Sequence, residues 1–159
     1  MRALAESVGR RLKAKKALLV TAESCTGGWV AQALTAVPGS SDWFERGFVT
    51  YSNASKQELL GVQADTLTRH GAVSEQTARE MALGALEHSH GTLALAVTGV
   101  AGPGGGSREK PVGMVCFAWA SRAGGASAET RHFSGDREAV RKQSVEHVLA
   151  RMLELLDST

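Results

Sequence analysis

A chain of 159 residues with 43% hydrophobic content is long enough to bury one full core, and we expect a single domain over residues 1–159. No apolar stretch is long enough to span a bilayer, and the net charge of +2 without a basic, aromatic-rich stripe argues against nucleic-acid binding. The two cysteines, Cys25 and Cys116, suggest no disulfide framework. The chain is therefore expected to be cytoplasmic, with neither a membrane nor a nucleic-acid partner.

The hydrophobic pattern alternates along the chain between the periods of a helix and of a strand. The expected elements are, in order, helix 2–15, strand 17–21, helix 27–36, strand 47–51, helix 53–60, a helix capped by Ser74, strands 93–97, 112–120 and 129–133, and a final helix starting at Gly135-Asp136. Such alternation predicts an α/β fold, a three-layer α/β/α sandwich with helices on both faces of a central sheet. The late hairpin at Gly124-Gly125 predicts that this sheet is mixed, although largely parallel.

The segment Thr21-Ala22-Glu23-Ser24-Cys25-Thr26-Gly27-Gly28 joins an apolar strand to an amphipathic helix through small and hydroxylated residues. Free N–H groups at the start of a helix attract negative charge, so Ser24 can be a nucleophile that faces an oxyanion site. Ser24 or Thr26 can equally be a helix cap, and the spacing leaves both interpretations open. Cys25 is a rival nucleophile, although a small buried residue is the commoner role of a cysteine.

The segment Gly47-Phe48-Val49-Thr50-Tyr51-Ser52-Asn53-Ala54-Ser55-Lys56 places Tyr51 at the end of a strand and Lys56 in the first turn of the next helix. The positive end of the helix dipole and any burial both favour the neutral amine, and so lower the pKa of this lysine toward the range of a general base. Lys56 is therefore a candidate base. The alternative is an ordinary solvated lysine.

Two further segments carry groups suited to binding an anion. The segment Val97-Thr98-Gly99-Val100-Ala101-Gly102-Pro103-Gly104-Gly105-Gly106-Ser107 ends an apolar strand in a glycine-rich loop, where ligands bind α/β sheets, but it is neither a Walker nor a dinucleotide-binding loop. A flexible connection explains the glycines equally well, and Thr98 can bond to a ligand or to a backbone group. Arg137 and Arg141 can form a fork to phosphate or carboxylate, or pair with acidic neighbours on the surface.

Several familiar chemistries are excluded by their motifs. The histidines form no H-E-x-x-H and the cysteines no C-x-x-C, so we expect no metal site. Ser24 lies in neither an S-x-x-K nor a G-x-S-x-G pattern, which excludes the β-lactamase and α/β-hydrolase arrangements.

Taken together, these segments resemble one family in order and in spacing. The matching motifs are Glu23-Ser24-Cys25-Thr26-Gly27-Gly28, Tyr51-Ser52-Asn53 with Lys56, Leu60-Gly61-Val62, His70-Gly71-Ala72-Val73-Ser74, Thr98-Gly99-Val100-Ala101-Gly102-Pro103 with Gly105-Gly106, Lys110-Pro111-Val112-Gly113 and Phe133-Ser134-Gly135-Asp136-Arg137. The pattern is similar to that of the nicotinamide-nucleotide amidases, the CinA C-terminal-domain family, over about residues 3–157. Some members carry an extra N-terminal domain, whereas this chain resembles a stand-alone amidase.

The resemblance implies hydrolysis of nicotinamide mononucleotide to nicotinic acid mononucleotide and ammonia, in pyridine-nucleotide salvage. It makes Ser24 the nucleophile of a Ser-Lys dyad and Lys56 the base, while Tyr51 assists proton transfer and Thr98 helps to hold the site. Substrate binding is expected at Thr26, Gly27, Gly102, Gly105, Gly106, Arg137 and Arg141. No metal or cofactor is expected, the partner is a small-molecule nucleotide, and the protein is expected to be a homo-oligomer.

Two alternatives stay open. The same loops can hold a nucleotide without chemistry, as a binding module linked to competence or DNA-damage proteins. A different phosphorylated amide can also be the substrate.

Overall fold

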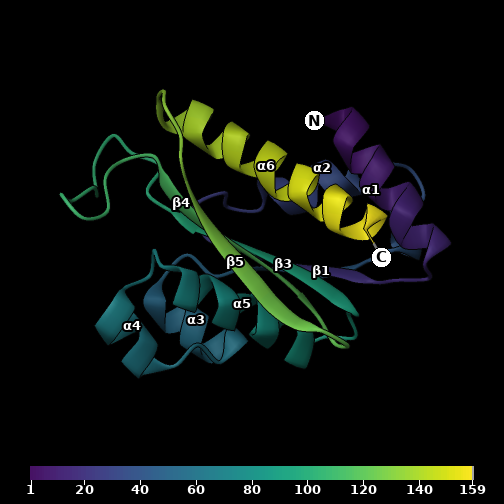
Figure 1. Ribbon diagram of the computed structural model, residues 1–159, viewed down its shortest axis with the longest axis horizontal. Coiled ribbons are helices and arrows are strands. Elements are labelled where there is room, and N and C mark those ends of the chain that lie inside the picture. The colour runs from purple at the N-terminus through teal and green to yellow at the C-terminus, as the bar shows by residue number, and fades with distance from the viewer. Residues whose placement is uncertain (159) are drawn as a thin grey trace.

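The computed structural model describes residues 1–158, which form a five-stranded sheet between two layers of helices (Figure 1). The strands are β1 (Leu19–Glu23), β2 (Phe44–Val49), β3 (Leu93–Gly99), β4 (Met114–Ser121) and β5 (Gly125–His132). Their spatial order is β2-β1-β3-β4-β5. β1 is parallel to β2 and β3, whereas β4 is antiparallel to β3 and β5. The expected mixed sheet is confirmed, but the sheet is not largely parallel: two of its four strand pairings are antiparallel, and the late hairpin supplies one of them.

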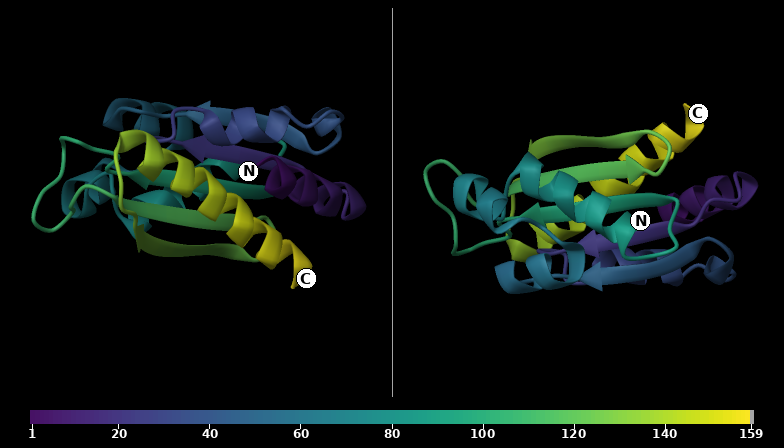
Figure 2. Two further views of the ribbon diagram at one scale, coloured as in Figure 1. Left: turned by 90° about the horizontal axis from the view of Figure 1, so that it is seen from above. Right: turned by 90° about the horizontal axis from the view of Figure 1, so that it is seen from below.

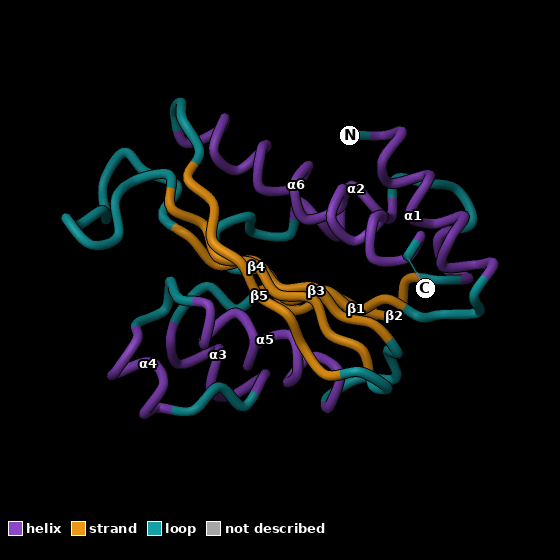
Figure 3. Tube along the Cα trace, viewed as in Figure 1, coloured by secondary structure: helices purple, strands orange, loops and turns teal. Residues whose placement is uncertain are grey.

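The helices cover both faces of this sheet, so the expected three-layer sandwich is also confirmed (Figures 2 and 3). One layer contains α1 (Arg2–Ala14), α2 (Trp29–Thr35) and α6 (Arg137–Asp157), and the other contains α3 (Asn53–Leu60), α4 (Ala64–His70) and α5 (Glu75–Glu87). Successive strand side chains point to opposite faces, which gives two buried clusters, one under each layer. Within residues 1–158, no helix is long and apolar enough to cross a membrane.

The predicted bounds of both edge strands are wrong, and one helix, α4, was not predicted. β2 runs over Phe44–Val49 rather than 47–51, and β5 begins at Gly125 rather than at 129. Both lie at the edges of the sheet and are largely half-buried or exposed, so the apolar alternation that locates a strand is faint in them. α4 buries only Thr66, so no apolar stripe marks it in the sequence.

The parallel strands β1 and β3 end at the same edge of the sheet, which is where ligands bind in folds of this class. Ser24 follows β1, and its N–H donates to the carbonyl oxygen of Val97 on β3 at 2.9 Å. α3 begins near this edge and packs against α5 on one face of the sheet. The fold thus brings the serine of one turn close to the first residues of α3.

The contact between α3 and α5 depends on a glycine. A Cβ added at Gly84 of α5 would lie 1.8 Å from the carbonyl oxygen of Leu60, the last residue of α3. No side chain fits between these two backbones, so Gly84 sets how closely α3 approaches α5.

Replacing Gly84 with alanine should therefore destabilise the protein. Although alanine favours a helix by about 1 kcal/mol, forcing two backbones apart costs more, and we expect a net loss of about 1–3 kcal/mol in the free energy of unfolding. Urea denaturation measures this loss. The matched control is Gly104→Ala, because a Cβ there meets nothing within 4 Å. Equal denaturation midpoints for the two variants would contradict the tight α3–α5 contact.

Candidate active site

A lysine buried in the protein contacts Ser24. The Nζ atom of Lys56, on α3, lies 3.1 Å from Ser24 Oγ. Only 1% of Lys56 and 8% of Ser24 are exposed. The structure therefore brings together the two residues expected to form the dyad, and Lys56 is not a solvated surface lysine.

The start of α3 fixes the Lys56 side chain. Ser52 and Ser55 form a capping box, in which each hydroxyl accepts a hydrogen bond from the other's backbone N–H. The loop before this cap supplies further partners for the amine. Lys56 Nζ lies 2.8 Å from the carbonyl oxygen of Thr50 and 3.5 Å from that of Tyr51.

These surroundings favour the neutral form of Lys56. Burial lowers the pKa of the Lys56 amine, while the negative charge of a Cys25 thiolate acts in the opposite direction. A neutral amine has two N–H groups and one lone pair. The two N–H groups match the two carbonyl oxygens, which leaves the lone pair for the Ser24 hydroxyl. This arrangement suits a base that accepts a proton from Ser24.

Cys25 is poorly suited to be the nucleophile. Burial raises the pKa of its thiol to about 12. Because the thiolate rather than the thiol attacks an electrophile, the neutral form of Cys25 is inert near neutral pH. Of the two neighbouring candidates, Ser24 is the one that has a base within reach.

Glu23 is a site residue that the sequence reasoning missed. Its fully buried carboxylate accepts hydrogen bonds from Thr26 Oγ1 at 2.6 Å, Val30 N at 2.9 Å and Ala31 N at 3.0 Å. The N-terminus of α2 is thus capped by Glu23, and the expectation that Ser24 or Thr26 caps it is wrong. A carboxylate that ends an apolar strand just before a helix was the available signal.

This cap also places Thr26 and the start of α2. Thr26 is fully buried and its hydroxyl is bonded to Glu23, so that hydroxyl does not face a substrate. The carboxylate also occupies the anion-binding end of α2, and a substrate anion has to bind elsewhere.

Arg141 holds the same turn from α6. Its Nε donates to the carbonyl oxygen of Cys25 and its Nη2 to that of Thr26, each at 3.1 Å. The guanidinium lies 5.5 Å from the centroid of the Trp29 ring, a cation–π distance. Gly27 has a φ of +59°, and a Cβ there would lie 3.4 Å from Arg141 Nη2. A glycine therefore suits both the turn and the close arginine.

Arg137 joins three segments beside the dyad. Its Nη1 donates to the carbonyl oxygen of Gly102 at 2.7 Å, and its Nη2 to the Tyr51 hydroxyl at 3.0 Å. Tyr51, of which 62% is exposed, follows β2, and Gly102 belongs to the loop between β3 and β4. Gly105 and Gly106 lie farther along that loop and are exposed. The structure thus clusters Tyr51, Gly102 and Arg137, and leaves the two other glycines at its margin.

Thr98 lies beside Ser24 on the same face of the sheet. Val97 pairs with Glu23, so the next residues of the two chains, Thr98 and Ser24, are also neighbours. The Thr98 hydroxyl is buried and donates to the carbonyl oxygen of Ala72 at 2.8 Å. It therefore ties the segment before α5 to the end of β3, next to Ser24.

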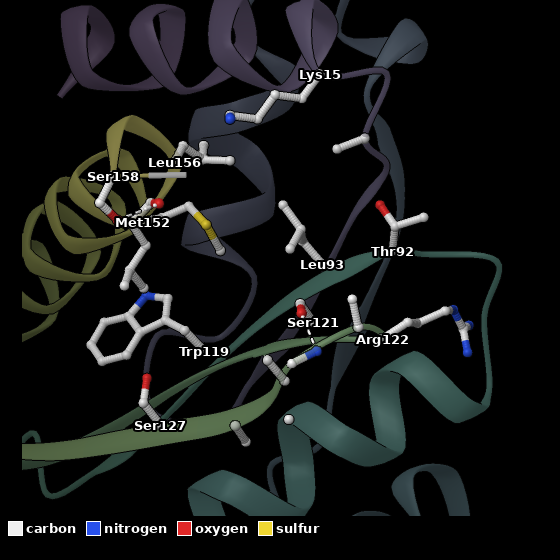
Figure 4. Close-up of a pocket in the computed structure, with 17 residues that line it drawn as sticks. Lys15, Thr92, Leu93, Trp119, Ser121, Arg122, Ser127, Met152, Leu156 and Ser158 are labelled. Atoms are coloured by element: carbon white, nitrogen blue, oxygen red, sulfur yellow. Dashed lines mark hydrogen bonds between the residues drawn. The ribbon is translucent and has the colours of Figure 1, made fainter.

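A cavity of about 670 Å³ lies away from this cluster. It opens between the C-terminal end of α6 and the β4–β5 hairpin, and Leu93, Trp119, Arg122, Met152 and Leu156 are among its lining residues (Figure 4). None of the expected site residues lines it. Among residues 1–158, no group of three or more histidine, cysteine, aspartate or glutamate residues is placed to hold a metal ion.

Comparison with known proteins gives a consistent result. The family model described as the CinA C-terminal domain matches residues 1–156. The nicotinamide-nucleotide amidohydrolase PncC of Escherichia coli strain K12 is 54% identical over 146 residues, which cover 92% of this chain and 88% of that protein. The protein of the same name from Pseudomonas putida is 50% identical, covering 96% of this chain and 94% of that protein. The crystal structure of the competence/damage inducible protein CihA from Agrobacterium tumefaciens superposes with a TM-score of 0.93 at 46% identity, covering 98% and 94% of the two chains.

Proposed function

Because this chain belongs to the CinA C-terminal domain family, we propose that it hydrolyses nicotinamide mononucleotide to nicotinic acid mononucleotide and ammonia. The observation that carries the proposal is the contact of 3.1 Å between Lys56 Nζ and Ser24 Oγ, with both residues buried. The names of the relatives from Escherichia coli and Pseudomonas putida support the same substrate.

The chemistry proceeds through an acyl-enzyme. Neutral Lys56 accepts the Ser24 proton as Oγ attacks the carboxamide carbon, and a tetrahedral intermediate forms. The Lys56 ammonium then protonates the departing nitrogen, and ammonia leaves. Water attacks the acyl group with Lys56 again as base, which releases the acid and restores Ser24. Tyr51 assists proton transfer by orienting the Lys56 amine through its carbonyl oxygen.

The negative charge of the intermediate needs hydrogen-bond donors. The backbone N–H groups of Cys25 and Thr26 directly follow the nucleophile, and within residues 1–158 neither donates to a backbone carbonyl oxygen. We assign them as the oxyanion hole. The phosphate of the substrate is assigned to Arg137 and to the loop that contains Gly102, Gly105 and Gly106, because Arg137 bonds to Gly102 of this loop and to Tyr51, whose carbonyl oxygen contacts Lys56.

The decisive experiment is an ammonia assay on the purified chain with nicotinamide mononucleotide, nicotinamide riboside and free nicotinamide. Ammonia release from the mononucleotide at the highest kcat/KM supports the proposal. Binding of the mononucleotide without ammonia release would instead support a non-catalytic nucleotide-binding module.

Substitution of the nucleophile should separate chemistry from binding. Ser24→Ala should lower kcat by about 10⁴-fold or more, because the attacking oxygen is lost, while the product still binds in a calorimetric titration. Cys25→Ala is the matched control at the next position and should keep much of the activity. An active Ser24→Ala enzyme beside an inactive Cys25→Ala enzyme would show that Cys25 is the nucleophile.

The pH dependence of turnover tests the role of Lys56. Only the neutral amine is active, and burial lowers its pKa, so activity should rise with pH through an apparent pKa below about 10.4. Activity is then lost as the pH falls through that value. Lys56→Arg keeps the charge but cannot release a proton, and it should be nearly as inactive as Lys56→Ala. A kcat of Lys56→Arg within about tenfold of wild type would remove Lys56 as the base.

Arg137 should affect affinity for the phosphate more than turnover. Loss of a charge-assisted hydrogen bond costs roughly 1.5–3 kcal/mol, so Arg137→Ala should raise KM for the mononucleotide about tenfold or more. KM for the riboside, which lacks the phosphate, should change far less. The comparison of the two substrates is the measurement, and equal effects on both would show that Arg137 does not bind the phosphate.

A further inference from the structure

The Arg141 side chain contacts the backbone, and not the side chains, of the turn formed by Ser24, Cys25 and Thr26, here called the nucleophile turn. Two guanidinium nitrogens, Nε and Nη2, each donate to one carbonyl oxygen, those of Cys25 and Thr26. Such a two-point contact restrains the orientation of two successive peptide units, because the guanidinium is planar and rigid.

The orientation of these units decides where their N–H groups point. The peptide bond between Cys25 and Thr26 is trans, so its C=O and its N–H point in opposite directions. The C=O faces Arg141, so the N–H of Thr26 points away from the guanidinium. α3, which carries Lys56, belongs to the opposite layer of the sandwich from α6 (Figure 1).

The other groups of Thr26 are already engaged. Its hydroxyl donates to the buried carboxylate of Glu23, and its carbonyl oxygen also accepts a hydrogen bond from Trp29 N at 3.0 Å. Within residues 1–158, its N–H donates to no backbone carbonyl oxygen. Two charged side chains thus hold the turn, the carboxylate of Glu23 and the guanidinium of Arg141.

We propose that Arg141 is a positioning residue for the oxyanion hole: it holds the peptide unit between Cys25 and Thr26 so that the Thr26 N–H faces the tetrahedral intermediate. The inference rests on the proposed serine mechanism. It gives Arg141 a role in transition-state stabilisation, distinct from binding of the substrate phosphate. Donors held in place before the reaction stabilise the transition state more than the substrate, so loss of Arg141 should reduce kcat rather than affinity.

The first test is steady-state kinetics of Arg141→Lys and Arg141→Gln with nicotinamide mononucleotide and with nicotinamide riboside. We expect kcat to fall about 10–100-fold, which is no more than the effect of deleting one oxyanion donor. KM for the mononucleotide should stay within about twofold of wild type. The fold-loss in kcat should be the same for the riboside. Lysine should not rescue, because one ammonium cannot replace the fork.

The matched control is Arg151→Gln on the same helix. Arg151 pairs with Glu154 on the exposed side of α6, and its loss should leave both constants unchanged. A rise in KM for the mononucleotide with an unchanged kcat, and no effect on the riboside, would show that Arg141 binds the phosphate and would overturn the inference. A wild-type enzyme that releases no ammonia would overturn the proposed function itself.

A second variant tests the N–H directly and leaves every side chain in place. The α-hydroxy acid analogue of threonine, introduced at position 26, replaces the Thr26 N–H with an ester oxygen. We expect kcat to fall about 10²–10³-fold, with product binding retained. An ester variant with wild-type kcat would overturn the inference, even if the Arg141 variants do not fold.

Discussion

Removal of the Lys56 amine from water is the constraint on which the site depends. An ammonium ion buried without compensation is costly, and the protein lowers that cost by favouring the neutral amine among oxygen atoms. The same desolvation that costs stability gives the lysine the lone pair that a base requires. The close packing at Gly84 and the serine cap of α3 hold the amine in place. The second helical layer therefore positions the proposed base and is not only a cover for the sheet.

The protein itself also stabilises the charge of Glu23, which lies beside the turn that carries Ser24. Glu23 is buried and forms no ion pair among residues 1–158, and its carboxylate accepts hydrogen bonds from a hydroxyl and from two helix N–H groups. The Glu23 carboxylate thereby neutralises the positive N-terminal end of the α2 dipole. The proposed phosphate site is instead formed where Arg137 bonds to Tyr51 and Gly102. The proposed reaction centre and the proposed phosphate site are thus separate, each with its own polar groups.

The sequence predicted the layers and the mixed sheet, because turn residues and apolar periods are local signals. It offered Ser24 and Lys56 only as separate candidates, and the family resemblance paired them. It did not predict the role of Glu23. The partners of its carboxylate, Val30 N and Ala31 N, lie seven and eight residues later in the chain. Edge strands were misplaced because half-exposed strands carry little apolar contrast. Arg141 was expected to bind substrate, since its sequence neighbourhood gives no indication that it contacts two backbone carbonyls 115 and 116 residues earlier in the chain.

The burial of Cys25 has a consequence for how the site meets reactive chemicals. Burial raises the pKa of the Cys25 thiol to about 12, so very little of it is thiolate near neutral pH, and peroxide and alkylating agents react with the thiolate. The sulfur next to the nucleophile is therefore shielded from oxidative damage, although it lies one residue from the reacting oxygen. Covalent labels that select for cysteine would pass over this centre, whereas agents that acylate or phosphonylate an activated hydroxyl match its chemistry.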